Sequence, residues 1–88
     1  MTARRTDANQ PAIVAALRQA GRLVQDLHLV GHGCPDLLVG GPSGRLVLLE
    51  VKTPGGTLNA REERWHVAWA GYPVYVVRTI EEALHATN

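Results

Sequence analysis

The chain has 88 residues, which is enough for one domain and leaves no room for a second. Hydrophobic residues make up 45% of it and charged residues 19%, a globular balance that argues against disorder. The formal net charge of +1 excludes the global basic field that many nucleic-acid binders carry. Any nucleic-acid contact therefore needs a local cluster of Lys and Arg, metal ions, or a dimer that pools charge.

Cysteine content and hydropathy limit the class of protein further. The single Cys34 excludes an intrachain disulfide and the usual Cys-rich zinc site. No segment has the apolar run of a signal peptide or a membrane span, so we expect a soluble, cytoplasmic protein without a membrane partner. Residues 1–6 are polar and predicted to be flexible, and residues 7–88 are predicted to form the single domain.

A first helix is predicted to begin near Asp7, because Asp7-x-x-Gln10 resembles a capping box. Ile13 and Leu17 fall on one face of this helix, and Gly21 is a natural C-terminal stop. Three strands follow, in the segments Arg22–Val30, 36–40 and Arg45–Lys52. The third strand is almost continuously apolar, which is typical of a central strand covered on both faces.

The second half of the chain contains two more capping patterns. Asn59-x-x-Glu62 opens a second helix that ends by Gly71, and Thr79-x-x-Glu82 opens a short final helix. Between them, residues 72–78 are rich in β-branched and aromatic side chains and are predicted to form a fourth strand. The predicted fold class is α/β, in the order α-β-β-β-α-β-α, with a mixed sheet flanked by helices.

Two acidic residues and a lysine are predicted to meet at one edge of this sheet. Glu50 and Lys52 point to the same side of the third strand, at its C-terminal end, where α/β sheets tend to place ligands. Asp36 begins the strand that pairs with it, and the residues between suffice for a hairpin that brings Asp36 beside Glu50. Close carboxylates repel each other, and a divalent cation relieves that repulsion.

The chemistry of these groups suits metal-assisted hydrolysis of a phosphodiester. Carboxylate oxygens from Asp36 and Glu50, together with the carbonyl of Val51, are the hard ligands that Mg²⁺ or Mn²⁺ prefers. Lys52 can orient the attacking water or stabilise developing negative charge. A simpler interpretation also exists, because Glu and Lys at a strand end are commonly a solvated rim and Asp after Pro is commonly a turn residue.

The joint pattern resembles a known nuclease signature. "CPDLLVG…RLVLLEVKTPGG" is similar to the PD-(D/E)xK motif, with Pro35-Asp36 followed by Glu50-Val51-Lys52. More narrowly, it resembles the virus-type replication-repair nuclease (VRR-NUC) domain and the small stand-alone phage proteins related to it. The resemblance also takes in "RRTDANQPAIVAALRQAG" and "WHVAWAGYPVYVVRTIEEAL", so it covers nearly the whole chain.

This resemblance implies a restriction-endonuclease-like core and a metal-dependent endonuclease that acts on DNA, including branched DNA such as four-way junctions. Its cell would be bacterial or phage-infected. Asp36 and Glu50 would be the metal ligands and Lys52 the catalytic lysine. The chain departs from the family pattern at three places. Glu62 stands where a Gln is common, the first helix offers Asp7, Asn9 and Gln10 where many relatives have a Glu, and the loop between Lys52 and the second helix is short.

Further residues have two interpretations each. Gln10 and Glu62 are accessory site residues or helix caps. Arg61 and Arg64 hold phosphates at a helix N-terminus or form a charged helix face, and His32 contacts substrate or is a loop residue.

Trp65 and Trp69 share one helix face, which favours core or interface over base stacking. An exposed pair would indicate a homodimer. Two alternatives to a deoxyribonuclease remain open: a catalytically silent DNA-binding or assembly module that retains the fold, and a nuclease that acts on RNA.

Overall fold

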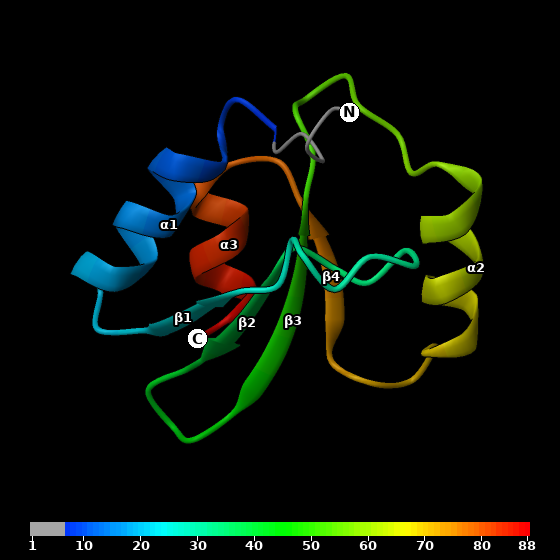
Figure 1. The fold of residues 1–88 in the computed structure, drawn as a ribbon. Coiled ribbons are helices and arrows are strands. Elements are labelled where there is room, and N and C mark those ends of the chain that lie inside the picture. The colour runs from blue at the N-terminus through cyan, green and yellow to red at the C-terminus, as the bar shows by residue number, and fades with distance from the viewer. Residues whose placement is uncertain (1–6) are drawn as a thin grey trace.

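Residues 7–88 of the computed structural model form a four-stranded sheet with helices on both faces (Figure 1). Residues 1–6, predicted to be flexible, lie outside the described residues. In chain order the elements are α1 (Gln10–Gln19), β1 (Leu23–Asp26), β2 (Leu37–Gly40), β3 (Leu46–Val51), α2 (Ala60–Ala68), β4 (Val74–Val77) and α3 (Ile80–Ala86). This is the predicted α-β-β-β-α-β-α order. Over the same residues, no helix combines the length and the apolar character that crossing a membrane requires.

The strands lie side by side in the order β1-β2-β3-β4. The first three pair antiparallel, while β3 and β4 pair parallel, so the prediction of a mixed sheet is confirmed. Helix α2 forms the crossover between the two parallel strands. Strand β3 has a neighbour on each side, and its central position agrees with its apolar sequence.

One face of the sheet carries the hydrophobic core. Along β3, the buried residues Val47, Leu49 and Val51 alternate, as side chains on one face of a strand must. They pack with residues of β2 and with α1 and α3, which lie together on this side in Figure 1. From α1, the core contains Ile13 and Leu17, as the helical spacing predicted.

The opposite face of the sheet lies toward α2, which covers it only in part, and this face is far less apolar at one end. Leu38 and Leu48 are half-buried there, and the next outward position along β3 is Glu50. In α2, the single buried side chain is that of Glu62. The acidic residues thus lie on the face that the hydrophobic core leaves unused.

The start of α1 differs from the prediction. The helix begins at Gln10, and Asp7 contributes a backbone carbonyl and no side-chain cap. The side chain of Asn9, at the N-cap position, instead donates to the carbonyls of Lys52 and Arg78 at 3.1 and 3.0 Å. These bonds attach α1 to the ends of β3 and β4, and local sequence spacing does not reveal them.

The prediction that the first strand runs to Val30 is also wrong. Strand β1 ends at Asp26, whose carboxylate Oδ1 accepts the backbone N–H of His28 at 2.8 Å and turns the chain. Leu29 consequently lies 87% exposed outside the sheet.

The two later capping predictions fare better. The box formed by Asn59 and Glu62 is complete, with both bonds at 2.9 Å. At α3 the hydroxyl of Thr79 caps the N–H of Glu82, but the Glu82 carboxylate accepts from Arg78 and the reciprocal bond to Thr79 is replaced.

The loop before Asp36 docks against the first turn of α2. Gly33 is buried there with φ of 83°, and a Cβ on it would overlap the carbonyl oxygen of Arg61. Only glycine satisfies both the left-handed backbone and this close approach. Gly33 therefore fixes the distance between the loop and α2.

Replacing Gly33 with Ala is expected to destabilise the protein much more than replacing Gly31. Gly31 has a similar φ of 74°, but a Cβ on it would meet no atom within 4 Å, so Gly31→Ala should cost about 1 kcal/mol through backbone strain alone. Gly33→Ala adds the overlap with α2 and should cost about 3 kcal/mol or more. Urea denaturation of both variants measures the difference, and equal losses would show that the loop does not need this contact.

Candidate active site

Asp36 and Glu50 lie opposite each other at the end of the β2–β3 hairpin. The last residues paired in the sheet are Leu37 and Leu49, and the next antiparallel position sets Asp36 against Glu50. Their side chains are hydrogen-bonded to each other. Asp36 Oδ2 also accepts the backbone N–H of Val51 at 2.8 Å. The hairpin register therefore brings both carboxyl groups to one point under α2.

Glu50 is 1% exposed, and this burial is the largest reason that the pKa of its carboxyl group is raised. The hydrogen bond to Asp36 and the charges of Asp36 and Glu62 act in the same direction and outweigh the attraction of Lys52. Together they raise the pKa of Glu50 to about 9, so the side chain is protonated at neutral pH. Its Oε1 atom is buried and has no hydrogen-bond partner among residues 7–88.

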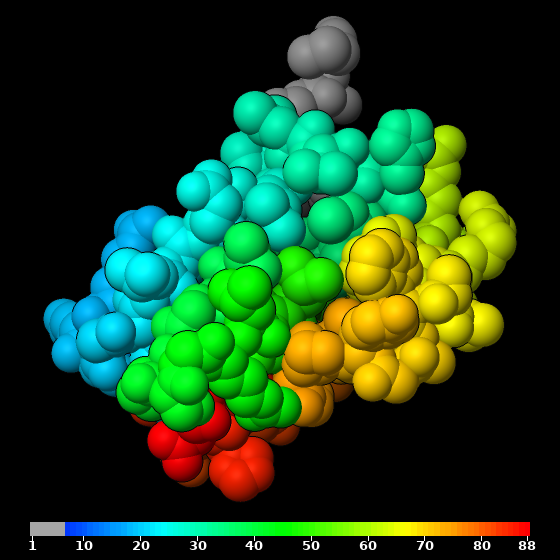
Figure 2. Space-filling view, turned by 90° about the horizontal axis from the view of Figure 1, so that it is seen from below, coloured from blue at the N-terminus to red at the C-terminus, as the bar shows by residue number. Residues whose placement is uncertain are grey.

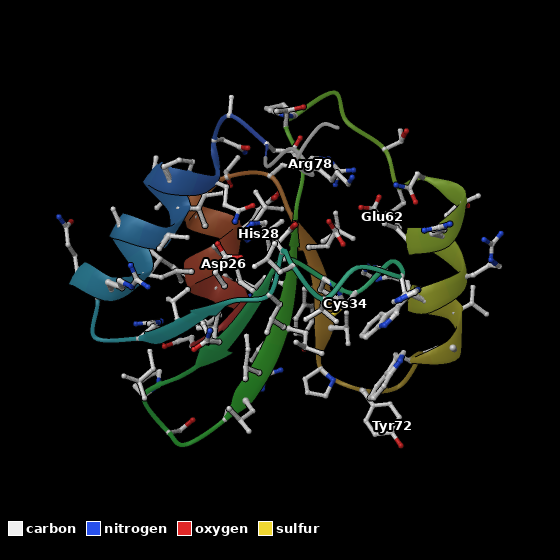
Figure 3. The ribbon with its side chains drawn as sticks, in the orientation of Figure 1. Asp26, His28, Cys34, Glu62, Tyr72 and Arg78 are labelled. Carbon is white, nitrogen blue, oxygen red and sulfur yellow. The ribbon has the colours of Figure 1, made fainter. Side chains whose placement is uncertain are left out.

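Lys52 is held by Glu62. Lys52 Nζ lies 2.8 Å from Glu62 Oε1, which also accepts the backbone N–H of Asn59. Burial opposes the charge on Lys52, but the hydrogen bond and charge of Glu62 prevail and raise the pKa of Lys52 above its ordinary value. Burial likewise favours neutral Glu62, yet the bonds from Lys52 and Asn59 lower the pKa of Glu62. Glu62 is thus both the helix cap and the ion-pair partner, and Figure 3 shows it projecting from α2 toward the sheet.

His66 faces the same site, although it was not among the predicted site residues. Its Nε2 lies 3.8 Å from Glu50 Oε1, which is too far for a hydrogen bond. Both atoms are buried, and neither has a hydrogen-bond partner in the described part of the chain. Burial is the main reason that the pKa of His66 is lowered, so its ring is neutral at neutral pH. The sequence signal was the spacing of Glu62 and His66, since residues four apart share a helix face.

Gln10 lies at the start of α1, next to the Asn9 side chain that bonds to Lys52. It is 4% exposed, and its Oε1 has no hydrogen-bond partner among residues 7–88. A buried, unsatisfied amide oxygen at this edge of the sheet is a free acceptor for a ligand.

The candidate DNA-binding residues lie beside α2's first turns. His32, Arg61 and Arg64 line one open depression of about 370 Å³, together with Trp65. The two tryptophans lie outside the core, because Trp65 is half-buried and Trp69 is 42% exposed. Their rings stack with centroids 4.9 Å apart.

A divalent cation fits the donor atoms at this site. Asp36 and Glu50 supply carboxylate oxygens at one point, and Glu50 Oε1 is buried and unpartnered. Such hard oxygen donors suit Mg²⁺ or Mn²⁺. In the described part of the chain, no three His, Cys, Asp or Glu side chains form a ready-made metal-ligand group.

No protein-family model and no curated protein matches the sequence. A solved VRR-NUC domain does match the structure, with a TM-score of 0.66 and 25% sequence identity. The match covers 85% of this chain and 89% of that one. The chain has the VRR-NUC fold. The resemblance to the VRR-NUC domain and the nuclease-like α/β fold class inferred from the sequence are both confirmed, whereas the likeness to the small phage proteins stays a prediction. This VRR-NUC-fold chain carries its acidic cluster on the sheet face below α2.

The buried Glu50 makes the stability of this VRR-NUC-fold chain depend on pH. Because its folded pKa lies above the value of 4.5 for an exposed carboxyl, its stabilising contribution is complete below pH 4.5 and is lost as the pH rises through about 9. In EDTA, Glu50→Gln should remove this fall and raise the free energy of unfolding at pH 8 by about 1–2 kcal/mol.

Denaturation curves from pH 5 to 9 measure this effect. Glu63→Gln is the matched control, because Glu63 is exposed in the same helix turn as Glu62 and should leave the pH profile unchanged. A Glu50→Gln protein that loses stability with pH as steeply as the parent would contradict the assignment.

Proposed function

We propose that this chain is a metal-dependent endonuclease that hydrolyses DNA phosphodiester bonds. The observation that carries the proposal is the meeting of Asp36, Glu50 and Lys52 at the end of β3, with a buried, unpartnered oxygen on Glu50. A protein built only for stability has no use for two hydrogen-bonded carboxyl groups and a lysine in one buried cluster. The VRR-NUC fold supports the same conclusion.

Asp36 and Glu50 would hold the cation, Mg²⁺ or Mn²⁺, with the carbonyl of Val51 and Oε1 of Gln10 as further candidate ligands. Once bound, the cation supplies positive charge to the phosphodiester and lowers the pKa of the attacking water. The hydrogen bond that the N–H of Val51 donates to Asp36 keeps the end of β3 in place while the carboxylates bind. The candidate oxygen donors thus lie at or beside the ends of regular elements, which suits a cation site.

Lys52 would place its ammonium beside the reacting phosphate, where it orients the water or stabilises the negative charge that develops. The 2.8 Å contact with Glu62 keeps Lys52 charged and restricts its flexible stem. Because Glu62 is itself fixed by the capping box of α2, the helix positions the lysine. Glu62 is therefore a positioning residue, and Gln at this position would hold Lys52 without the ion pair.

The proposed activity predicts cleavage that depends on metal and on Lys52. Single-stranded, duplex, flap, splayed-arm and four-way-junction DNAs should be incubated with Mg²⁺, Mn²⁺ or EDTA, beside one RNA strand. Cutting should occur with metal only, and Asp36→Asn and Lys52→Ala should lower the rate about 10²-fold or more. Branched substrates should be cut best, and Glu63→Gln should behave as the parent.

The outcomes separate the candidate functions. Folded protein that binds DNA but cuts none of the substrates would identify a silent binding or assembly module. Cleavage of the RNA strand alone would identify a ribonuclease. Equal cutting by the parent and Lys52→Ala would point to a contaminating enzyme.

We further propose that the chain works as a homodimer, which would place two sites for symmetric cleavage of a branched substrate. The support is an apolar patch around a hollow of about 140 Å³, formed by Leu38, Leu46, Val47, Leu48, Trp69, Tyr72, Pro73 and Val74. Figure 2 shows the start of β3 (green) beside the segment that joins α2 to β4 (yellow to orange) on one surface. Water contact with this much exposed aromatic and leucine surface is unfavourable.

Light scattering should therefore give a dimer mass for the parent. Leu46→Lys should give a monomer, because Leu46 is 62% exposed at the edge of the patch and a charge there opposes burial. Leu29→Lys is the control, because Leu29 is more exposed but lies outside the patch, and it should remain dimeric. A monomeric parent at working concentration would defeat the dimer without affecting the nuclease proposal.

A further inference from the structure

The depression beside α2 combines positive charge with an aromatic ring. It is lined by His32, Arg61, Arg64 and Trp65. Both arginines are exposed, and among residues 7–88 neither guanidinium makes a hydrogen bond or an ion pair. Other arginines are engaged: Arg22 and Arg45, for example, bond to carbonyls of α3. The depression therefore carries positive charge that no described protein group neutralises.

The position of these groups is fixed by the fold. Gly33 packs on the carbonyl of Arg61, so the preceding His32, with φ of 57°, is held beside the first turn of α2. Arg61 and Trp65 are one helical turn apart and thus neighbours on the helix surface. The loop and the helix present their side chains to one side as a preformed surface.

Trp65 lies between this positive charge and the acidic cluster. Its ring stacks on Trp69 at 4.9 Å with an interplanar angle of 9°, which restricts its rotation. Its ring also contacts that of His66 edge-on at 5.7 Å, and His66 Nε2 is 3.8 Å from Glu50. A chain of contacts therefore leads from Glu50 through His66 and Trp65 to the depression.

We propose that an unpaired nucleotide stacks on Trp65 while Arg61 and Arg64 bind its phosphates, so that the substrate carries a single-stranded segment next to the bond that is cut. Base–aromatic stacking needs an open base face, and a duplex offers only base edges and phosphates. Positive charge that tracks the backbone beside an aromatic platform is the usual chemistry of single-strand binding. The link to cleavage rests on the proposed nuclease function, whereas binding of the strand does not.

A second copy of the chain is the weaker candidate for this depression. The apolar patch that suits a protein partner includes Trp69 and Tyr72. Figure 3 shows Tyr72 at the far end of α2 from Glu62. The depression itself is lined by two arginines and a histidine. Two copies meeting there would bring like charges together.

Binding is tested in EDTA, where no cutting occurs, with two variants that each retain one tryptophan. Trp69→Leu leaves Trp65 as the single tryptophan, and Trp65→Leu leaves Trp69. A short oligothymidylate should quench the fluorescence of Trp69→Leu and leave that of Trp65→Leu unchanged. Affinity for the strand should fall about tenfold in Trp65→Leu, and a duplex of equal length should bind more weakly and quench little. A matching oligouridylate shows whether RNA binds equally.

The arginines are tested in the parent background, where the tryptophans and the fold are intact. Arg61→Gln combined with Arg64→Gln should lower strand affinity and reduce the slope of log affinity against log salt by about 0.7 for each phosphate that is no longer bound. Arg18→Gln, an exposed arginine on α1, should leave the slope unchanged.

Quenching in both single-tryptophan proteins, equal affinity for strand and duplex, or an unchanged salt slope in the double variant would overturn the proposal. Self-association that disappears in the double arginine variant would assign the depression to a second copy. Strand binding without any metal-dependent cleavage would contradict the proposed nuclease function and leave the proposed stacking site standing. Metal-dependent cleavage, together with Trp65 fluorescence that the oligothymidylate does not quench, would contradict the proposed stacking site and leave the nuclease function standing.

Discussion

The hydrogen bond between Asp36 and protonated Glu50 joins two acidic groups in a place from which water is largely excluded. Burial makes the charged form of Glu50 expensive, and the nearby carboxylates add to that cost. Two neighbouring groups reduce this cost. The backbone N–H of Val51 donates a hydrogen bond to Asp36, and Lys52 brings positive charge close to the acidic groups. What remains is an unpartnered oxygen on Glu50, and a cation would supply the missing partner.

Helix α2 is shaped by this constraint more than by hydrophobic burial. Its single buried side chain is Glu62, and its capping box and its ion pair use the same carboxylate. His66 and Trp65 follow on adjoining faces, so one short helix links the acidic cluster to the positively charged depression. Gly33 then fixes the loop before Asp36 against the same helix. One element therefore positions groups from three parts of the chain.

The sheet divides its two faces between stability and function. One face packs Val47, Leu49 and Val51 against α1 and α3, and this core supplies most of the hydrophobic burial. The other face begins with exposed leucines and ends with Glu50, which leaves an apolar patch at one end and the polar cluster at the other. In so small a chain the second face is incompletely covered, and we propose that a second copy of the chain covers its apolar patch.

The sequence by itself determined the element order, the strand spacing and the meeting of Asp36 with Glu50, because strand alternation and hairpin length are local properties. It also determined the cap at Asn59 and Glu62, where both bonds span three residues. Only the tertiary structure decided the rest. Asn9 bonds to the carbonyls at the ends of β3 and β4 instead of capping its own helix. The turn at Asp26 spans only two residues, so its signal is local even though the strand prediction ran past it.

The tertiary structure likewise decided the surroundings of the site. The contacts of Lys52 with Glu62 and of His66 with Glu50 depend on how α2 lies on the sheet, as do the exposure of the tryptophans and the depression that Trp65 borders. Sequence periodicity tells which side chains share a face of one element. It carries no information on which other element covers that face, and the chemistry here arises between elements.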